Sequence, residues 1–390
     1  MHLTSVHPPF DVRIFHKECK SVARAGYEVT LIAGHDCDEI VDGVHLRGIS
    51  RRSNRISRMI WSTWDVCCKA LREDADLYHF HDPELIPVGL LMRLKKKHVI
   101  YDVHEDVQAD VATKVYIPRP IRRPLAWFAG AIERLSSRCF SAIVPATPGI
   151  RRRFGFRPRD TVVISNYPLL DVNVCRAQRP WSERSASVVY AGLISKDRCI
   201  GSVVQAMGLL PLGVKATLNL AGAFSPPGYA QELASTPGWS RVKVLGAVDH
   251  PEVARFLSEA RAGLCVYRPD ANSLEGIPTK LFEYMQAGIP VIASDFPGFR
   301  AIVSTERCGL LVDPLDPASI ARAIEYLLGH PEEAREMGQR GQEAVRKTFN
   351  WVSEESKLLA LYAALLRSQP RGLLAAQGHL GSAHTELRET

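Results

Sequence analysis

The sequence lacks the features that mark membrane-spanning and secreted proteins. No run reaches the ~18 continuous apolar residues that a membrane-spanning helix needs, and the opening MHLTSVHPP has no apolar segment long enough for a signal peptide. The nine cysteines include no CxxC pair, the spacing typical of zinc and redox sites. An odd, unpatterned set of cysteines indicates reduced thiols. We therefore expect a cytoplasmic protein without structural disulfides.

The sequence also lacks the spacing of a metal site. The nearest candidate is HFHD at 79–82, in which His79 and His81 occupy alternate positions of an expected strand. They would share one face of that strand, but the sequence offers them no third ligand. We expect neither a metal nor another cofactor.

Apolar runs that alternate with helical patterns are abundant, and the length of 390 residues favours two domains. In the first half we expect a helix at 13–26, ending at Gly26, and strands at 29–34, 76–82, 98–105, 141–147 and 161–168. In the second half we expect strands at 187–195, 215–224, 241–248, 262–269, 289–295 and 309–314. Regular alternation of strand and helix predicts parallel sheets with helices on both faces.

The alternation lapses into polar, irregular residues at 169–186, which indicates a domain boundary. We predict an α/β protein with two Rossmann-like, doubly wound domains, at 1–175 and 185–350. A helix at 351–368 carries an apolar stripe that includes Leu358, Leu359 and Tyr362, so it must dock on another element. The Gly-, Ser- and His-rich tail at 369–390 is expected to be flexible.

The stretch LEGIPTKLFEYMQAGIPVIASD, at 274–295, combines a helix with two acids. Pro278 suits the first turn and Gly288 the end, which predicts a helix at about 278–287. In open parallel sheets, ligands bind at the carboxyl ends of strands beside helix N-termini. Glu275 and Glu283 would then hold polyols on either side of a phosphate. Alternatively, Glu275 caps the helix and Glu283 is a solvated surface acid.

Several long motifs together resemble the retaining GT-B glycosyltransferases, specifically glycosyltransferase family 4. They are PPFDVRIFHKECKSVARAGYEVTLIAG, FHDPELIPVGLL, VIYDVHEDV, YAGLIS, LGAVDHPEV, the 274–295 stretch and CGLLVDPLDP. The resemblance covers nearly the whole chain. It implies a GT-B fold of two facing domains, the first binding the acceptor and the second the nucleotide sugar, with the C-terminal helix crossing back to the first.

The resemblance also implies roles for residues of the second domain. Glu283 would hold the ribose hydroxyls of a nucleoside diphosphate, and Glu275 would lie against the transferred sugar. The backbone amides of Gly276 and Ile277 would face the diphosphate. Around Val248, contacts with the base would come mostly from the backbone.

Two cations are candidates for the leaving phosphate. Arg198 stands where the family usually has Lys, and Lys280 is the second candidate, although it also fits a solvated surface position. The resemblance also places Gly192, within the expected strand at 187–195, in the donor site. Many members have Arg directly after this glycine, whereas this chain has Leu193, which leaves Arg198 with more of the charge to neutralise.

In the first domain, His104 of YDVHED matches the family's histidine near the sugar and the acceptor; a satisfied structural histidine is the alternative. His7, in the loop SVHPPFD, and Asp82 are acceptor-side candidates. Asp82 alternatively orients a neighbouring helix.

The implied activity is that of a hexosyltransferase (EC 2.4), which moves a sugar from a UDP- or GDP-linked donor to a hydroxyl of a saccharide or lipid-linked acceptor, with retention of configuration. A nucleotide-sugar 2-epimerase is one alternative. A catalytically inactive, nucleotide-binding homologue is another, suggested by Leu193 and by the short first strand, MHLTS.

Positive charge is concentrated in the first half. Residues 1–186 carry 29 Lys and Arg against 21 Asp and Glu, while 187–390 carry 20 against 21. Residues 47–72 hold seven of the basic residues together with a stripe formed by Ile56, Ile60, Trp64, Cys67 and Leu71. This predicts either a helix that adsorbs to anionic lipid or a core-facing helix with a wet face. A second basic cluster comprises Arg151, Arg152, Arg153, Arg157 and Arg159. No nucleic-acid recognition motif accompanies the charge.

Overall fold

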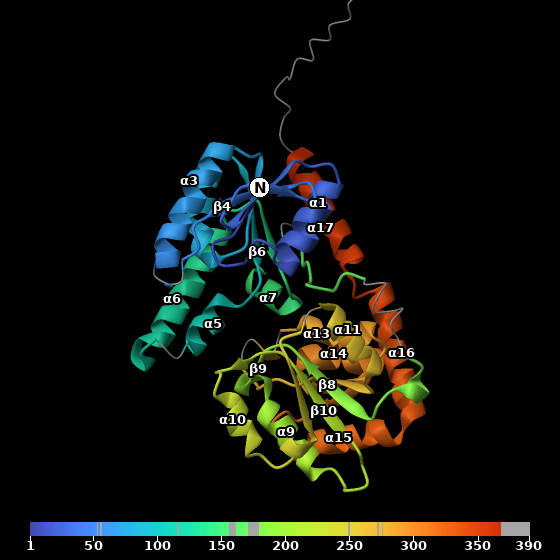
Figure 1. Ribbon diagram of the computed structural model, residues 1–390. Coiled ribbons are helices and arrows are strands. Elements are labelled where there is room, and N and C mark those ends of the chain that lie inside the picture. The colour runs from blue at the N-terminus through green and yellow to red at the C-terminus, as the bar shows by residue number, and fades with distance from the viewer. Residues whose placement is uncertain are drawn as a thin grey trace, which may run out of the picture.

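The structure is a computed structural model that describes residues 1–52, 54, 57–114, 117–155, 161–170, 179–248, 250–270, 273–274 and 276–367. Two large sheets, one in each half of the chain, lie between layers of helices (Figure 1). This confirms the predicted fold class. The limits proposed for the domains stay a prediction, since part of the linking segment and the tail at 369–390 fall outside the described residues.

The first sheet has seven strands in the order β3-β4-β2-β1-β5-β6-β7. Its strands are β1 (His2–Leu3), β2 (Val29–Gly34), β3 (Glu39–Val41), β4 (Val44–Ile49), β5 (Leu77–Phe80), β6 (His98–Val103) and β7 (Ala142–Pro145). Its helices are η1 (Val12–Cys19), α1 (Lys20–Arg24), η2 (Arg58–Ser62), α3 (Thr63–Glu73), η3 (Pro83–Leu85), α4 (Ile86–Leu94), α5 (Val107–Thr113), α6 (Arg119–Ser137) and α7 (Pro148–Arg153). Every pairing is parallel except β3 with β4.

The second domain contains a six-stranded parallel sheet in the order β12-β10-β8-β13-β14-β15 and a two-stranded sheet of β9 and β11. The strands are β8 (Ser187–Ala191), β9 (Ile194–Ser195), β10 (Thr217–Ala221), β11 (Phe224–Ser225), β12 (Val242–Gly246), β13 (Ala262–Cys265), β14 (Val291–Ser294) and β15 (Gly309–Val312). The helical segments are η4 (Trp181–Glu183), η5 (Lys196–Arg198), α9 (Ile200–Leu209), α10 (Tyr229–Ala234), η6 (Trp239–Arg241), α11 (His250–Glu259), α13 (Thr279–Gln286), α14 (Pro297–Glu306), α15 (Pro317–Gly329) and α16 (Pro331–Lys347).

Two details of the first sheet differ from the sequence prediction. The expected strand at 161–168 is wrong: the segment has an isolated bridge, Thr161 to Ile143, although the amides of Val162 and Ile164 still donate to carbonyls of β7. The next amide, that of Ser165, donates to the Glu354 carboxylate at 2.9 Å. The β3–β4 hairpin was missed, although its turn at Asp42-Gly43, with φ of 52° and 79°, is a common hairpin signal.

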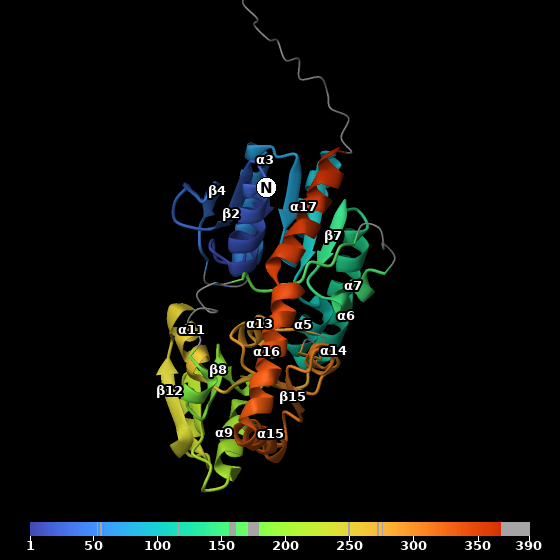
Figure 2. The ribbon, with the colours of Figure 1, turned by 90° about the vertical axis from the view of Figure 1, so that its right-hand side faces the viewer.

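The last helix, α17 (Trp351–Arg367), returns to the first domain, continuing the direction of α16 (Figure 2). Its apolar stripe docks there as predicted. Trp351 and Leu358 are fully buried with side chains of η1 and the first sheet, and the Trp351 indole donates to the Ser21 hydroxyl at 2.9 Å. Burial of two large apolar side chains favours this docking by about 1.5–3 kcal/mol each.

The elements that follow the strands of each sheet lie between the two domains. Below the first sheet are α5 and α7, and above the second sheet are β9 and α14 (Figure 1). The carboxyl ends of both parallel sheets are therefore turned toward each other, which is where a ligand of this architecture binds.

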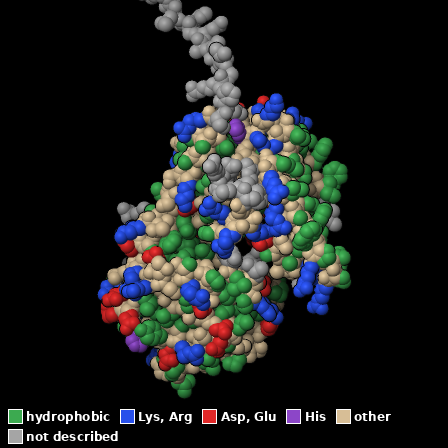
Figure 3. Space-filling view, turned by 180° about the vertical axis from the view of Figure 1, so that it is seen from behind, with side chains coloured by type: hydrophobic (Ala, Val, Ile, Leu, Met, Phe, Trp, Pro, Cys, Tyr) green, Lys and Arg blue, Asp and Glu red, His purple; other side chains and the backbone are tan. Residues whose placement is uncertain are grey.

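Helix α6 presents an apolar stripe to solvent rather than to the core. The stripe has a helical spacing and consists of Ile121, Leu125, Phe128, Ile132 and Leu135, with Trp127 beside it, all exposed. The residues that face inward are small or polar: Ala126, Gly130, Glu133 and Ser137. Hydrophobic side chains gather along this edge of the first domain, at the right in Figure 3, with Lys and Arg side chains below them.

The predicted stripe at 47–72 is also exposed. Ile60, Trp64 and Leu71 face solvent, whereas Val66 and Ala70 of α3 are buried. Helix α3 therefore faces the core through Val66, Ala70 and the partly buried Cys67 and has a solvated face, as the second interpretation predicted. Adsorption to anionic lipid stays a prediction. Ile56 lies outside the described residues, as do Arg157 and Arg159 of the second basic cluster. In the described part of the chain, no helix is both long and apolar enough to cross a bilayer.

Candidate active site

Glycine loops form the edge of the second sheet where β8 and β10 end. Gly192 and Gly222 have φ of 127° and 146°, a backbone conformation that other residues rarely adopt. A Cβ atom on Gly222 would collide with the carbonyl oxygen of Gly192. The two loops therefore pack backbone against backbone, which leaves the exposed Gly192 accessible at this edge.

Lys280 lies directly against Gly192. Its Nζ is 4.0 Å from the centre of the Tyr190 ring and 5.7 Å from that of Tyr267, and a Cβ atom on Gly192 would come within 2.9 Å of it. Burial lowers the pKa of Lys280 to about 8, and the positive charge of Arg198 also lowers it. Lys280 is thus a partly desolvated cation, not the solvated surface lysine of the alternative interpretation.

Arg198, the last residue of η5, supplies a second positive charge. Its guanidinium lies 4.2 Å from the centre of the Tyr267 ring, the same ring that Lys280 approaches. The half-buried guanidinium stacks on this ring in the manner of a cation–π contact. The structure therefore brings together the two candidate cations, although Leu193 stands where many relatives of the family have a cation.

Helix α13 carries Lys280 and, one turn later, Glu283 on its surface. Pro278 is the N-cap and Gly288, with φ of 65°, follows the helix end, close to the predicted bounds. Burial lowers the pKa of Lys280 and of Lys17 in the first domain, and the half-buried Glu283 carboxylate opposes part of both shifts. Glu283 therefore faces the space between the domains.

The remaining predicted donor residues that the structure describes, Gly276, Ile277 and Val248, show no close contact with Arg198 or Lys280 among the described contacts. Gly276 and Ile277 precede α13 directly and are half-buried, and the Ile277 side chain packs against the core beneath the helix. Val248 is half-buried beyond the end of β12. Glu275 lies outside the described residues, so its contact with the sugar stays a prediction.

Lys17 of η1 is a cation that the sequence analysis missed. Its side chain is buried, its Nζ donates to Asn166 Oδ1 at 2.7 Å, and the Glu283 charge reaches it from the second domain. Burial, and then the charge of the nearby Arg13, lower the pKa of Lys17 to about 8. The KEC segment of η1 is an ordinary helical pattern, and only the packing of the two domains reveals this position.

His7 and His104 lie together at the edge of the first sheet, with ring centroids 5.1 Å apart. Nε2 of His104 is 2.9 Å from Oδ2 of Asp102. His7 lies 3.5 Å from both Asp11 and Asp82. Burial lowers the pKa of His7, but these two carboxylates outweigh it and the net shift is upward.

Asp82 organises the loop after β1. Its Oδ2 accepts hydrogen bonds from the Thr4 hydroxyl at 2.8 Å and from the Ser5 amide at 2.6 Å. Asp82 thus holds the loop that carries His7, a contact that neither of its predicted roles included. Its second oxygen, Oδ1, faces His7.

A buried ion pair lies behind His104. The Arg13 guanidinium donates to both oxygens of Asp102, at 3.0 and 2.8 Å, and contacts Glu18. Burial would raise the pKa of Asp102, but Arg13 and His104 hold it well below its usual range. Burial, and then the Asp102 charge, raise the pKa of Glu18 well above its usual value. Asp102 is therefore the ionised acid and Glu18 the neutral one.

Three histidines and Glu18 converge in the same core. Strand pairing sets His2 opposite His79, His81 follows on the same face, and η1 adds Glu18. All four are fully buried. The sequence analysis found only the pair in HFHD, because the other two groups come from distant segments.

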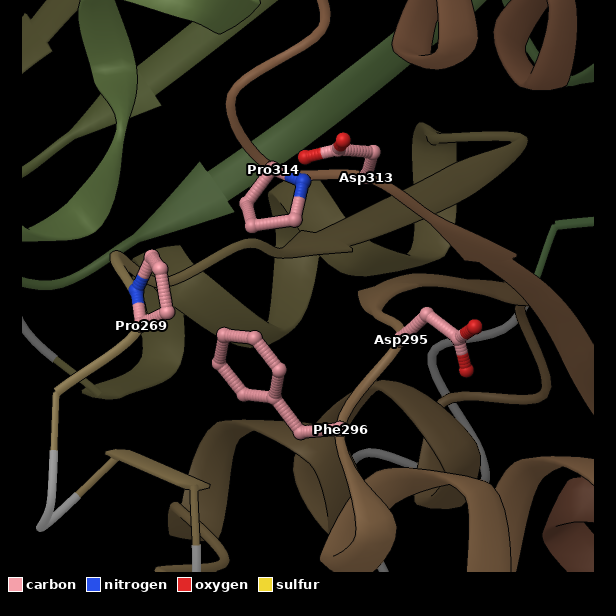
Figure 4. Close-up of a pocket in the computed structure, with 5 residues that line it drawn as sticks. All are labelled: Pro269, Asp295, Phe296, Asp313 and Pro314. Carbon is pink, nitrogen blue, oxygen red and sulfur yellow. The ribbon is translucent and has the colours of Figure 1, made fainter.

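A separate pocket of about 280 Å³ lies beyond β13, β14 and β15 (Figure 4). Pro269, Asp295, Phe296, Asp313 and Pro314 line it. In Figure 4 the Phe296 ring lies between Pro269 and Asp295, below Pro314 and Asp313, while Asp295 pairs with Arg300 at 2.7 Å. None of the predicted site residues lines this pocket.

Comparison with known proteins assigns the chain to a family. The family model "Glycosyl transferases group 1" matches residues 172–344, and "Glycosyl transferase 4-like domain" matches 12–167. The chain belongs to the group 1 glycosyltransferases. Phosphatidyl-myo-inositol mannosyltransferase of Mycobacterium leprae is 24% identical to this glycosyltransferase over 301 residues, which are 76% of this chain and 75% of the relative. Two other curated relatives match over shorter stretches, and the chain spans 47% and 44% of their lengths.

Solved structures share the fold of this glycosyltransferase. Sucrose-phosphate synthase of Thermosynechococcus elongatus superposes with a TM-score of 0.74 at 20% identity, covering 94% of this chain and 99% of that one. Anabaena HepE, in complex with UDP and glucose, gives a TM-score of 0.67 at 14% identity, covering 93% and 98%. The glycosyltransferase therefore has the GT-B fold predicted from its sequence.

Proposed function

We propose that this glycosyltransferase moves a sugar from a UDP- or GDP-linked donor to a hydroxyl of a growing polysaccharide or glycolipid, with retention of configuration. The observation that carries the proposal is that Arg198 and Lys280 approach the same Tyr267 ring. Lys280 also lies beside Gly192 and one turn before Glu283 on α13. Two cations beside a helix N-terminus suit a diphosphate. A carboxylate farther along the helix suits the ribose hydroxyls.

In the proposed reaction, the bond between the anomeric carbon and the β-phosphate oxygen breaks. Arg198, Lys280 and the amides before α13 stabilise the charge that develops on the phosphate. The acceptor oxygen attacks the anomeric carbon from the face that the phosphate leaves, and its proton passes to the departing phosphate. The two cations and the helix amides take the role of a metal ion, so the proposed transfer needs no added cofactor.

The donor is proposed from chemistry and from the structural relatives. HepE binds UDP with glucose, which supports a nucleoside diphosphate sugar in the matching domain here. On the acceptor side we propose His104, His7 and Asp82 at the facing edge. Because one relative is a phosphatidyl-myo-inositol mannosyltransferase, a lipid-linked acceptor is included with saccharides.

We further propose that the enzyme adsorbs from the cytoplasm to the anionic inner face of the plasma membrane. The exposed apolar side chains of η2 and α3 include Trp61 and Trp64, and α3 lies on the same side of the first domain as α6 (Figure 1). Arginines flank both surfaces, including Arg119 and Arg123 on α6. Apolar side chains within a basic border suit insertion among anionic headgroups.

The function is tested by supplying candidate nucleotide sugars with and without acceptors and analysing the products. A thermal-shift screen first selects the donor, since a ligand of the folded state raises the melting temperature. We expect a retained glycoside that forms only with acceptor. Conversion of the donor alone to its 2-epimer, or nucleotide binding without hydrolysis or transfer, would contradict the proposal.

A further inference from the structure

An unbroken series of hydrogen bonds runs from His104 into the core of the first domain. His104 Nε2 and His81 Nδ1 lie 2.9 and 3.1 Å from the same oxygen, Oδ2 of Asp102. His81 Nε2 is 3.0 Å from Nδ1 of His2. The chain then passes to Tyr362 of the crossing helix, whose hydroxyl is 3.0 Å from Nε2 of His2.

The ionised Asp102 determines the direction of the first bonds. A carboxylate only accepts hydrogen bonds, so His104 must donate from Nε2 and His81 from Nδ1. The second nitrogen of a neutral imidazole is an acceptor. The pKa of His81 is lowered, chiefly by burial, which keeps the ring neutral near pH 7. Its Nε2 must therefore accept a hydrogen bond from Nδ1 of His2.

The same reasoning continues to the end of the chain. Because His2 donates from Nδ1, its Nε2 accepts from the Tyr362 hydroxyl. The Tyr362 oxygen in turn accepts from Nδ1 of His79, at 3.0 Å. Burial lowers the pKa values of His2 and His79 as well, so both rings are neutral. Every bond in the series then has one donor and one acceptor.

A metal site is the competing interpretation of this cluster, since His2, Glu18, His79 and His81 offer ligand atoms within 4.8 Å of one another. Both nitrogens of His2 and of His81 already have hydrogen-bond partners. The rings of these two residues are also stacked, at an interplanar angle of 10°. A cation needs ring planes whose lone pairs converge on one point, so the hydrogen-bonded chain is the better account.

We infer that Asp102, His81, His2 and Tyr362 are positioning residues, which hold His104 as the Nε2–H tautomer and leave its Nδ1 as an acceptor for a sugar hydroxyl. This rests on the proposed function only in the use made of His104. The tautomers follow from the hydrogen bonds together with the ionised Asp102 and the neutral buried rings. The chain also links the site to α17, because Tyr362 is the only member from outside the first 104 residues.

The test is to read the tautomers directly. The full chain is labelled with ¹⁵N, and long-range ¹H–¹⁵N spectra of the imidazoles are recorded at pH 7.5. We expect Nε2–H for His104 and Nδ1–H for His2, His79 and His81. Free histidine prefers Nε2–H, so three buried Nδ1–H rings form a distinctive signature. An Nε2–H signal from His81 would overturn the inference, whatever the activity.

A variant then tests positioning. Tyr362→Phe removes the donor to His2, so we expect the signals of His2 and His81 to change and kcat to fall by about tenfold, as for a misaligned catalytic group. The Kd for the nucleoside diphosphate should not change. Tyr326 is an exposed tyrosine of α15. The matched control Tyr326→Phe should alter neither the imidazole signals nor kcat. Unchanged imidazole signals and kcat in Tyr362→Phe would refute the positioning role.

The outcomes separate this inference from the proposed function. Expected tautomers in a protein that binds nucleotide but transfers no sugar would support the chain and contradict the function. Normal sugar transfer with a different tautomer pattern would support the proposed function and contradict the hydrogen-bonded chain. Asp102→Asn is the stronger variant, expected to lower kcat by at least ~10²-fold, since an amide at this position supports the wrong tautomer.

Discussion

Arg13 and Asp102 form a two-point ion pair in the interior of the first domain, with the guanidinium Nε and Nη2 3.0 and 2.8 Å from the carboxylate oxygens. Arg13 is 3% exposed and Asp102 is not exposed at all. Asp102 in turn accepts hydrogen bonds from His81 and His104. This single charge therefore connects the stability of the domain with the orientation of a candidate site residue.

Removal of one partner of this pair should be costly. We expect Arg13→Met to lower the free energy of unfolding by about 3–5 kcal/mol, because it leaves Asp102 buried without its counter-charge. Urea denaturation measures the loss. Arg24→Met is the control, since it breaks the Arg24–Glu355 pair at the surface and should cost less than about 1 kcal/mol. Equal effects of the two variants would contradict this account of Asp102.

The buried histidines predict a loss of stability in acid. Burial, and then the charge of His81, hold the pKa of His79 well below 6.5, so below pH 6.5 the unfolded chain binds a proton that the folded chain does not. The free energy of unfolding should therefore fall as pH falls. Glu18, whose pKa is raised, acts with the opposite sign.

His79→Asn isolates the contribution of one ring. Its amide can still donate to Tyr362, but it cannot titrate. We expect the pH slope of the unfolding free energy below pH 6.5 to decrease by up to about 1.4 kcal/mol per pH unit. Denaturation at pH 7.5, 6.5 and 5.5 provides the measurement, and parallel slopes for the variant and wild type would show that His79 titrates normally.

Loss of Arg198 should slow transfer. We expect Arg198→Ala to lower kcat by at least ~10²-fold, because the leaving phosphate loses a positioned charge. Glu275→Ala is expected to have an effect of the same size. Lys196→Ala is the control: this lysine lies two residues away, is exposed and pairs with Glu232. Near wild-type kcat in both site variants would refute the assignment of the donor site.

Donor binding should weaken in alkali. Lys280 has a pKa of about 8, so it is a cation below this pH and neutral above it. We expect the affinity for UDP or GDP, measured by titration calorimetry, to fall between pH 7 and pH 9. In Lys280→Met the affinity should be lower at pH 7 and its pH dependence reduced. Any pH dependence of the affinity that persists in Lys280→Met would report on Lys17, whose pKa is also about 8.

Adsorption to lipid should depend on α6. We expect wild type to pellet with anionic vesicles and not with neutral ones. The double variant Trp127→Ser and Phe128→Ser should bind these vesicles at least tenfold more weakly. Each of the two aromatic rings, exposed in the free protein, would contribute about 1.5–3 kcal/mol to the binding free energy when it is buried in the bilayer. Leu212→Ser removes a fully exposed side chain of the second domain and serves as control. Equal pelleting with both kinds of vesicle would exclude the proposed surface.

Local sequence patterns were enough to predict most helices and strands of the fold. The strand that became β14 and the helix that became α13 are bounded by Pro and Gly signals that act within a few residues, so their limits were predicted closely. The segment at 161–168 has the same apolar pattern as a strand, yet it forms only an isolated bridge to β7, and the Ser165 amide donates to Glu354 of α17 instead. Such long-range competition for backbone groups has no local signal.

The sequence by itself determined the two α/β domains, the family, and the placement of Lys280 and Glu283 on one helix, because residues close in the chain stay close in a regular element. The approach of Arg198 to Lys280 depends on the tertiary structure, which brings η5 beside α13. Only the tertiary structure decided that Lys280 is desolvated against Gly192 and that His2, His81 and Tyr362 join behind His104. Those relationships depend on strand register and on helix docking, which bring together residues up to 360 positions apart. The pKa values and tautomers that follow are properties of the packed core, not of any single segment.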